Sequence, residues 1–190
     1  MKISNRRLRE IIAEEIAISA PAIKQAISGI VVSAEPAECD LSEELTCWLG
    51  SLKCCRDWFH GAHHVVKGPS FSGDHVELFG KIYSGIEEDF DGDVEKAIGV
   101  SGDIAVACPQ KICATAMTCM QQYPSPCNLT ADEIAKTGLD MVMSHIAKVE
   151  TLFTTLEGQN CLTLGLNDHL SAQANTFESY AYLLKQRCGC

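Results

Sequence analysis

Apolar residues recur at helical spacing in four long segments of this chain, and no segment alternates between apolar and polar residues over a useful length. The four segments span residues 41–66, 72–98, 130–157 and 166–186. Intervals of three and four residues place apolar side chains on one face of a helix, whereas a strand needs a period of two. The chain is therefore predicted to be all-α.

The connections between these segments predict how the helices are arranged. The first two are separated only by Gly68-Pro69-Ser70, which favours antiparallel neighbours. A long, proline-containing connection over residues 99–129 follows, with room for a short helix near 110–121. Two hairpins joined in this way predict a ferritin-like four-helix bundle over residues 40–190. Residues 1–39 are predicted to be an N-terminal helical extension and linker.

Composition limits the functional classes. The formal charge of −10 argues against general nucleic-acid binding, which depends on phosphate neutralisation. The sequence contains no apolar run long enough to span a bilayer, and no secretory signal is expected from its first residues. A cytoplasmic location without membrane contact is therefore expected. Most of the eleven cysteines are then expected to be free thiols. The alternative for Cys188–Cys190 and for the cysteines of residues 108–127 is a metal, thiol-redox or intersubunit disulfide site.

Two histidines and two carboxylates are the candidate metal ligands. His63 and His75 flank the Gly-Pro turn, and Asp91 and Glu95 share one face of the second helix. Imidazole and carboxylate ligands together suit iron or another transition metal. His75 and Asp91 are sixteen residues apart, or about 24 Å along a helix, so one chain cannot bring them to one ion. The site is therefore predicted to lie between two subunits.

The run H-H-V-V-K-G-P-S-F, with a second histidine twelve residues after the first, resembles the Dps miniferritins, the DNA-protecting proteins of starved cells. The D-x-x-x-E of Asp91 and Glu95 also matches, and residues 167–184 resemble the family's last helix. The resemblance covers residues 41–186. It implies a homo-oligomer, a dodecamer built from twofold dimers, with iron as the bound metal and zinc as an alternative. It further implies Fe(II) oxidation by peroxide, iron storage and protection against oxidative damage, with His63, His75, Asp91 and Glu95 as catalytic ligands.

The sequence departs from this family at several positions. Phe79 stands where the family has an aspartate four residues after the second histidine, and Asp91 and Glu95 arrive one residue late. One extra residue in the second helix, absorbed at its start or by a π-bulge, would restore their register and would leave Gly80 at the aspartate position. Asp74 is then the favoured substitute ligand, with Glu77 as another candidate. His64 replaces the family's tryptophan.

Two alternative functions remain open. A chain that keeps the bundle without full chemistry would be a non-enzymatic ferritin-like scaffold or particle component, such as one from a phage. A basic stretch at Lys2, Arg6, Arg7 and Arg9 could instead compact DNA, although the overall charge makes such binding weak at best. His60 and His64 are expected to be satisfied histidines that bind no metal, with neighbours of the ligands or alternative ligands as the other interpretations. His145 and His169 are assigned no role.

Overall fold

Every regular element is helical in residues 41–189, the part of the chain that this computed structural model describes. The prediction of an all-α chain is therefore confirmed for that range. The predicted N-terminal helical extension and its basic stretch lie outside the described residues. Within the described residues, no helix combines the length and apolar character needed to cross a membrane.

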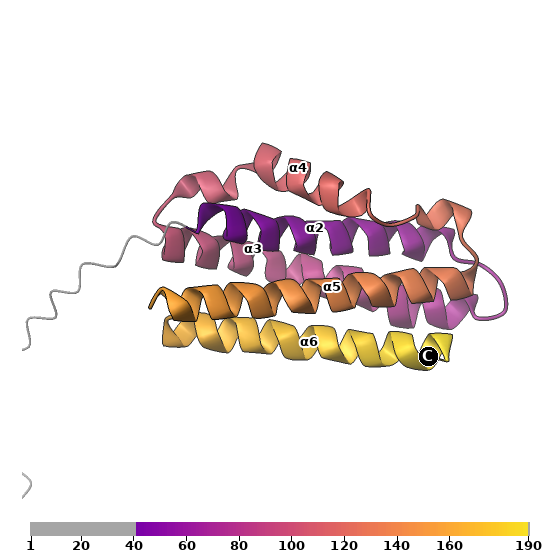
Figure 1. Cartoon of the computed structure of the whole chain (residues 1–190). Coiled ribbons are helices and arrows are strands. Elements are labelled where there is room, and N and C mark those ends of the chain that lie inside the picture. The colour runs from indigo at the N-terminus through magenta and orange to yellow at the C-terminus, as the bar shows by residue number, and fades with distance from the viewer. Residues whose placement is uncertain (1–40, 190) are drawn as a thin grey trace, which may run out of the picture. The chain divides into compact units, whose positions relative to one another are not determined.

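The five α-helices of residues 41–189 follow the predicted order along the chain (Figure 1). Four are long and one is short, and their bounds are α2 Ser42–Val65, α3 Lys81–Ser101, α4 Pro109–Met120, α5 Ala131–Gly158 and α6 Leu164–Cys188. Three shorter helices lie in the connections, namely the π-helix η1 (Gly73–Gly80) and the 3-10 helices η2 (Ile104–Ala107) and η3 (Pro126–Asn128). Each helix predicted within the described residues is present, and its ends lie within three residues of the prediction when η1 and α3 are taken together as the predicted second helix.

Local signals explain where the helices begin and end. The Thr130 side chain accepts a hydrogen bond from the Glu133 amide, and the Glu133 carboxylate accepts one from the Thr130 amide. This capping box satisfies two amides that the first turn of α5 would otherwise leave unpaired. Between α2 and η1, Gly68 has φ +107°, a conformation that side-chain-bearing residues rarely adopt.

Helix α2 has neighbours on more than one side. It contacts α3 and α5, and the short α4 also packs along it (Figure 1). An amphipathic helix that covers a core on one side buries a single stripe, but α2 buries a wider surface. Its buried residues are Leu45, Trp48, Leu49, Gly50, Ser51, Leu52, Cys54, Cys55, Trp58, Phe59 and Ala62. Helix α5 in turn packs on α6.

Candidate metal centre

His63 and His75 form a reciprocal pair where α2 and η1 meet. The Nδ1 atom of each ring lies 2.5 Å from the backbone carbonyl oxygen of the other residue. The rings are stacked, with centroids 3.7 Å apart and planes 15° apart. A carbonyl oxygen can only accept, so each neutral ring carries its proton on Nδ1. Each Nε2 therefore keeps its lone pair, the form in which histidine binds a transition metal.

The wide turn that brings His75 to His63 is a π-helix of eight residues, η1. A π-helical turn, one of the two ways considered for absorbing an extra residue in the second helix, is thus present in the backbone. A π-helical turn takes in an additional residue compared with an α-helical turn. It also crowds Gly80, where a Cβ atom would lie 2.8 Å from the His75 carbonyl oxygen and 3.3 Å from His63 Nδ1. The histidine pair therefore depends on glycine at this position.

Neither Phe79, at the expected aspartate position, nor Asp74, its favoured substitute, is available as a free ligand beside the histidines. Phe79 is fully buried and packs on Phe59, with ring centroids 6.1 Å apart. Asp74 is 2% exposed, and both of its oxygens are already paired. Arg187 Nε lies 2.7 Å from Oδ1 and Arg187 Nη2 lies 2.9 Å from Oδ2, which also accepts from the Ser70 hydroxyl at 2.6 Å. Asp74 therefore anchors Arg187, and a metal ion would have to displace that pair.

Two further histidines and a tyrosine adjoin the pair. His60 and His64 lie one helical turn apart, with their Nε2 atoms 3.2 Å from each other. The Tyr83 ring lies 4.7 Å from the His60 ring and 5.2 Å from the His63 ring, measured between centroids. Four imidazoles thus gather beside one phenol at the end of α2. The interpretation of His60 and His64 as alternative ligands stays a prediction.

Asp91 and Glu95 are exposed on α3, well along the helix from the histidine pair. Glu87, on the preceding part of this surface, forms an ion pair with Arg56. Within residues 41–189, no three His, Cys, Asp or Glu side chains are grouped so that they could hold a metal ion. The structure of a single chain thus separates the predicted ligands into a histidine half and a carboxylate half.

Asp93, between the two exposed carboxylates, points into the protein instead. It is fully buried, and its Oδ1 lies 2.6 Å from His169 Nε2 and 2.9 Å from Gln173 Nε2, which donates to it. The second oxygen, Oδ2, has no hydrogen-bond partner. Burial disfavours the charged form and raises the pKa of Asp93 to about 6, although the His169 contact opposes this shift.

The same polar network continues through the core to α5 and α2. Gln173 Oε1 accepts from Trp48 Nε1 at 2.7 Å and lies 3.3 Å from His145 Nε2, while His145 Nδ1 lies 2.7 Å from Ser51 Oγ. Burial lowers the pKa of His145 to about 3, so the ring is neutral near pH 7. The sequence prediction gave His145 and His169 no role. The missed signal is that His145 occupies the buried stripe of α5 between Val142 and Val149, where a polar residue needs a partner.

Comparison with protein-family models, curated proteins and solved structures found no significant match to this chain.

Proposed function

We propose that this chain is a ferritin-like four-helix-bundle protein that oxidises Fe(II) at sites shared between two copies, with peroxide as the electron acceptor. The observation that carries the proposal is the His63–His75 pair. Two neutral rings, stacked 3.7 Å apart and each held through Nδ1 by a backbone carbonyl, keep their Nε2 lone pairs available to a metal ion. The stacking of the rings restricts both orientations before any metal arrives.

The arrangement of helices supports the ferritin-like part of the proposal. The hairpin of α2 and α3 and the hairpin of α5 and α6 are joined by a long connection that contains α4 (Figure 1). A long crossover between the second and third helices of a bundle is the connectivity of ferritin-like proteins. The likeness of residues 41–186 to Dps miniferritins points to the same fold and to a dodecamer.

A second copy would supply the carboxylates. In an antiparallel twofold dimer, Asp91 and Glu95 of one chain would face His63 and His75 of the other, and the symmetry would create two equal sites. Imidazole nitrogens and carboxylate oxygens suit iron. Two Fe(II) ions would each give one electron to hydrogen peroxide, which takes up two protons and becomes two water molecules. Asp74 is left out of this ligand set because both of its oxygens pair with Arg187 and Ser70.

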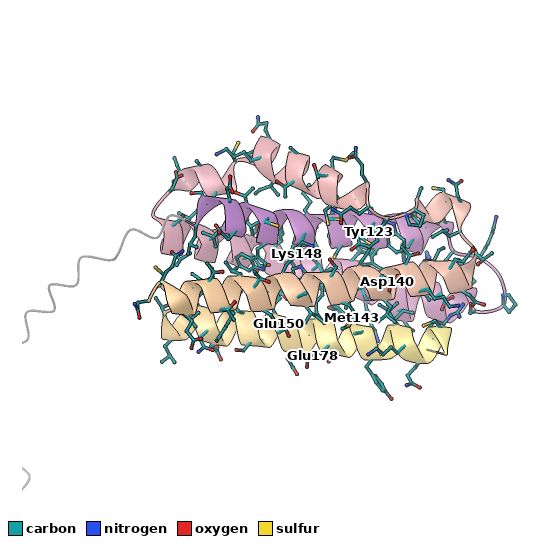
Figure 2. The ribbon with its side chains drawn as sticks, viewed as in Figure 1. Tyr123, Asp140, Met143, Lys148, Glu150 and Glu178 are labelled. Carbon is teal, nitrogen blue, oxygen red and sulfur yellow. The ribbon has the colours of Figure 1, made fainter. Side chains whose placement is uncertain are left out.

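The test is the rate of ferric absorbance after anaerobic Fe(II) loading and addition of hydrogen peroxide. A His63→Ala/His75→Ala chain and an Asp91→Ala/Glu95→Ala chain should each lose at least tenfold in rate, because each lacks half of every site. The matched control is Glu150→Ala/Glu178→Ala, which removes the same two charges from exposed positions on α5 and α6 (Figure 2). Oxidation at the wild-type rate in both site variants would refute the proposal.

One observation favours the scaffold alternative. Phe79 is buried and Asp74 is paired with Arg187, so neither supplies a third carboxylate to the histidines. A site with fewer acids binds iron less tightly. If the wild-type protein assembles into a closed shell but binds no Fe(II) and consumes no peroxide with Fe(II) present, the chain is a scaffold that has kept the bundle without the chemistry.

A further inference from the structure

A cluster of three thiols lies between α2 and α4, far along α2 from the histidine pair. Cys54 and Cys55 on α2 are 0% and 2% exposed, and Cys119 on α4 is 9% exposed. The Cys54 thiol and the Cys119 sulfur are hydrogen-bonded to each other. Neither of these two cysteines is in a disulfide in this structure. The prediction of free thiols holds for the cluster, but these two thiols are also direct neighbours.

The contact follows from how α4 packs on α2. A Cβ atom on Gly50 would lie 2.5 Å from Thr115 Cγ2, so the two helices approach most closely where α2 has no side chain. Helices α2 and α4 run in the same direction (Figure 1). Cys54 and Cys119 each follow this point by four residues, about one helical turn, and therefore meet again along the same contact between the two helices. One further turn along α2, Trp58 Nε1 donates to the Pro124 carbonyl oxygen at 3.0 Å. Contacts on both sides thus fix the register of the two cysteines.

The surroundings make the two sulfurs chemically different. The hydrogen bond from Cys54, together with the ammonium of Lys148, lowers the pKa of Cys119 to about 6. The same hydrogen bond and burial raise the pKa of Cys54 far above its ordinary value, and burial raises that of Cys55 to about 12. Lys148 lies on α5 near the boundary between α5 and α2 (Figure 2). Tyr123, just after α4, lies close to that boundary between α5 and α2. Near pH 7, Cys119 is thus the thiolate and Cys54 a protonated thiol beside it.

We propose that Cys54 and Cys119 form a peroxide-sensitive dithiol, which closes into a disulfide that ties α4 onto α2. The thiolate is the reactive form of cysteine, and a resolving thiol at contact distance converts the first product into a disulfide. The Cys119 sulfur attacks one oxygen of hydrogen peroxide and breaks the O–O bond, which gives a sulfenic acid and, after protonation, one water. The Cys54 sulfur then attacks the Cys119 sulfur, the S–O bond breaks, and the hydroxyl leaves with the Cys54 proton as a second water. Two thiols have lost two electrons and the peroxide has gained them.

The test uses the reduced full-length protein without iron, so that its outcome is independent of the proposed iron oxidation. After treatment with stoichiometric hydrogen peroxide, the remaining thiols are alkylated in acid and the peptides are sequenced by mass spectrometry. The expected product is a peptide pair joined through Cys54 and Cys119. Cys54→Ser and Cys119→Ser should each abolish it, whereas Cys55→Ser and Cys113→Ser should retain it. Cys113 is the matched control because it is an exposed thiol on the same helix as Cys119.

A second readout tests the order of the two steps. In Cys54→Ser, dimedone should trap a Cys119 sulfenic acid that persists, because the resolving thiol is missing, whereas in the wild type trapping should fall at least tenfold. Formation of the disulfide in the wild type should accelerate as pH rises through about 6. Two results would overturn the proposal. One is a crosslink that needs Cys55 rather than Cys54. The other is that Cys54 and Cys119 stay reduced in peroxide-treated protein whose exposed thiols have been oxidised.

Discussion

At the scale of single residues, the histidine pair depends on the absence of a side chain at Gly80. A methyl group there would lie 2.8 Å from the His75 carbonyl oxygen and 3.3 Å from His63 Nδ1, and the first of these atoms belongs to rigid backbone. Gly80→Ala should therefore destabilise the fold by about 1–3 kcal/mol. It should also weaken Fe(II) binding, because the two rings would separate. Denaturant unfolding and Fe(II) titration of the same variant measure both effects.

The matched control for this prediction is Gly99→Ala. Gly99 also lies in a helix, but a Cβ atom there would meet nothing within 4 Å. Alanine should stabilise an unobstructed helical position by up to about 1 kcal/mol. If both variants were equally stable, the proximity of Gly80 to the histidines would have no energetic consequence.

His145 should make the stability of the protein depend on pH. Its pKa is lowered from 6.5 to about 3, so between these values the unfolded chain binds a proton that the folded chain does not. The unfolding free energy therefore falls as pH falls from 6.5 toward 3, by up to about 1.4 kcal/mol per pH unit from this residue alone. His145→Gln, which keeps a buried hydrogen-bonding group, should have a shallower slope between pH 7 and pH 5 in urea unfolding. Parallel slopes for the two proteins would contradict the prediction.

At the scale of elements, Arg187 joins the end of α6 to two other parts of the fold. It pairs with the buried Asp74 of η1, and its Nη1 lies 2.7 Å from the exposed Asp132 of α5. Arg187→Ala would leave the buried Asp74 charge without an opposite charge, with only the Ser70 hydroxyl bonded to it, and should cost about 3–5 kcal/mol. Hydrogen exchange should also become faster in residues 70–80, which the pair holds against α6. Unfolding by denaturant and exchange mass spectrometry give the two measurements.

Asp132→Asn provides the comparison on the same arginine. This carboxylate is 75% exposed, and exposed ion pairs contribute no more than about 1 kcal/mol. The variant should therefore unfold close to the wild type and leave the exchange of residues 70–80 unchanged. A loss as large as that of Arg187→Ala would place the stabilising contact at Asp132 rather than at Asp74.

The elements also show what the sequence could predict. Periodicity located the four long helical segments of the described residues, because each amphipathic segment has a neighbour to cover its apolar face. Periodicity could not show that Asp74 pairs with Arg187, because that contact joins residues 113 positions apart. The same limit explains Asp93. Asp93 is one helical turn from Phe90 and from Ala97, so the sequence places it at the buried edge of α3. The sequence could not indicate its partners, because His169 and Gln173 belong to a different hairpin.

At the scale of the whole molecule, the proposed site requires two copies. If the His63→Ala/His75→Ala chain and the Asp91→Ala/Glu95→Ala chain are denatured together and refolded as a mixture, half of the twofold dimers should contain one copy of each. Every such dimer has one fully substituted site and one intact site. About a quarter of all sites should then be intact, and the rate of peroxide-dependent Fe(II) oxidation should recover to about a quarter of the wild-type rate.

The mixture separates an intersubunit site from an intrasubunit one. A site made by one chain stays broken in every dimer, because each chain lacks either its histidines or its carboxylates. Mixing the two proteins without unfolding controls for exchange of subunits, and the unmixed variants carried through the same refolding give the baseline. Recovery in the refolded mixture would require His63 and His75 of one chain to work with Asp91 and Glu95 of another. No recovery, in a mixture shown by mass spectrometry to contain mixed dimers, would exclude the shared site.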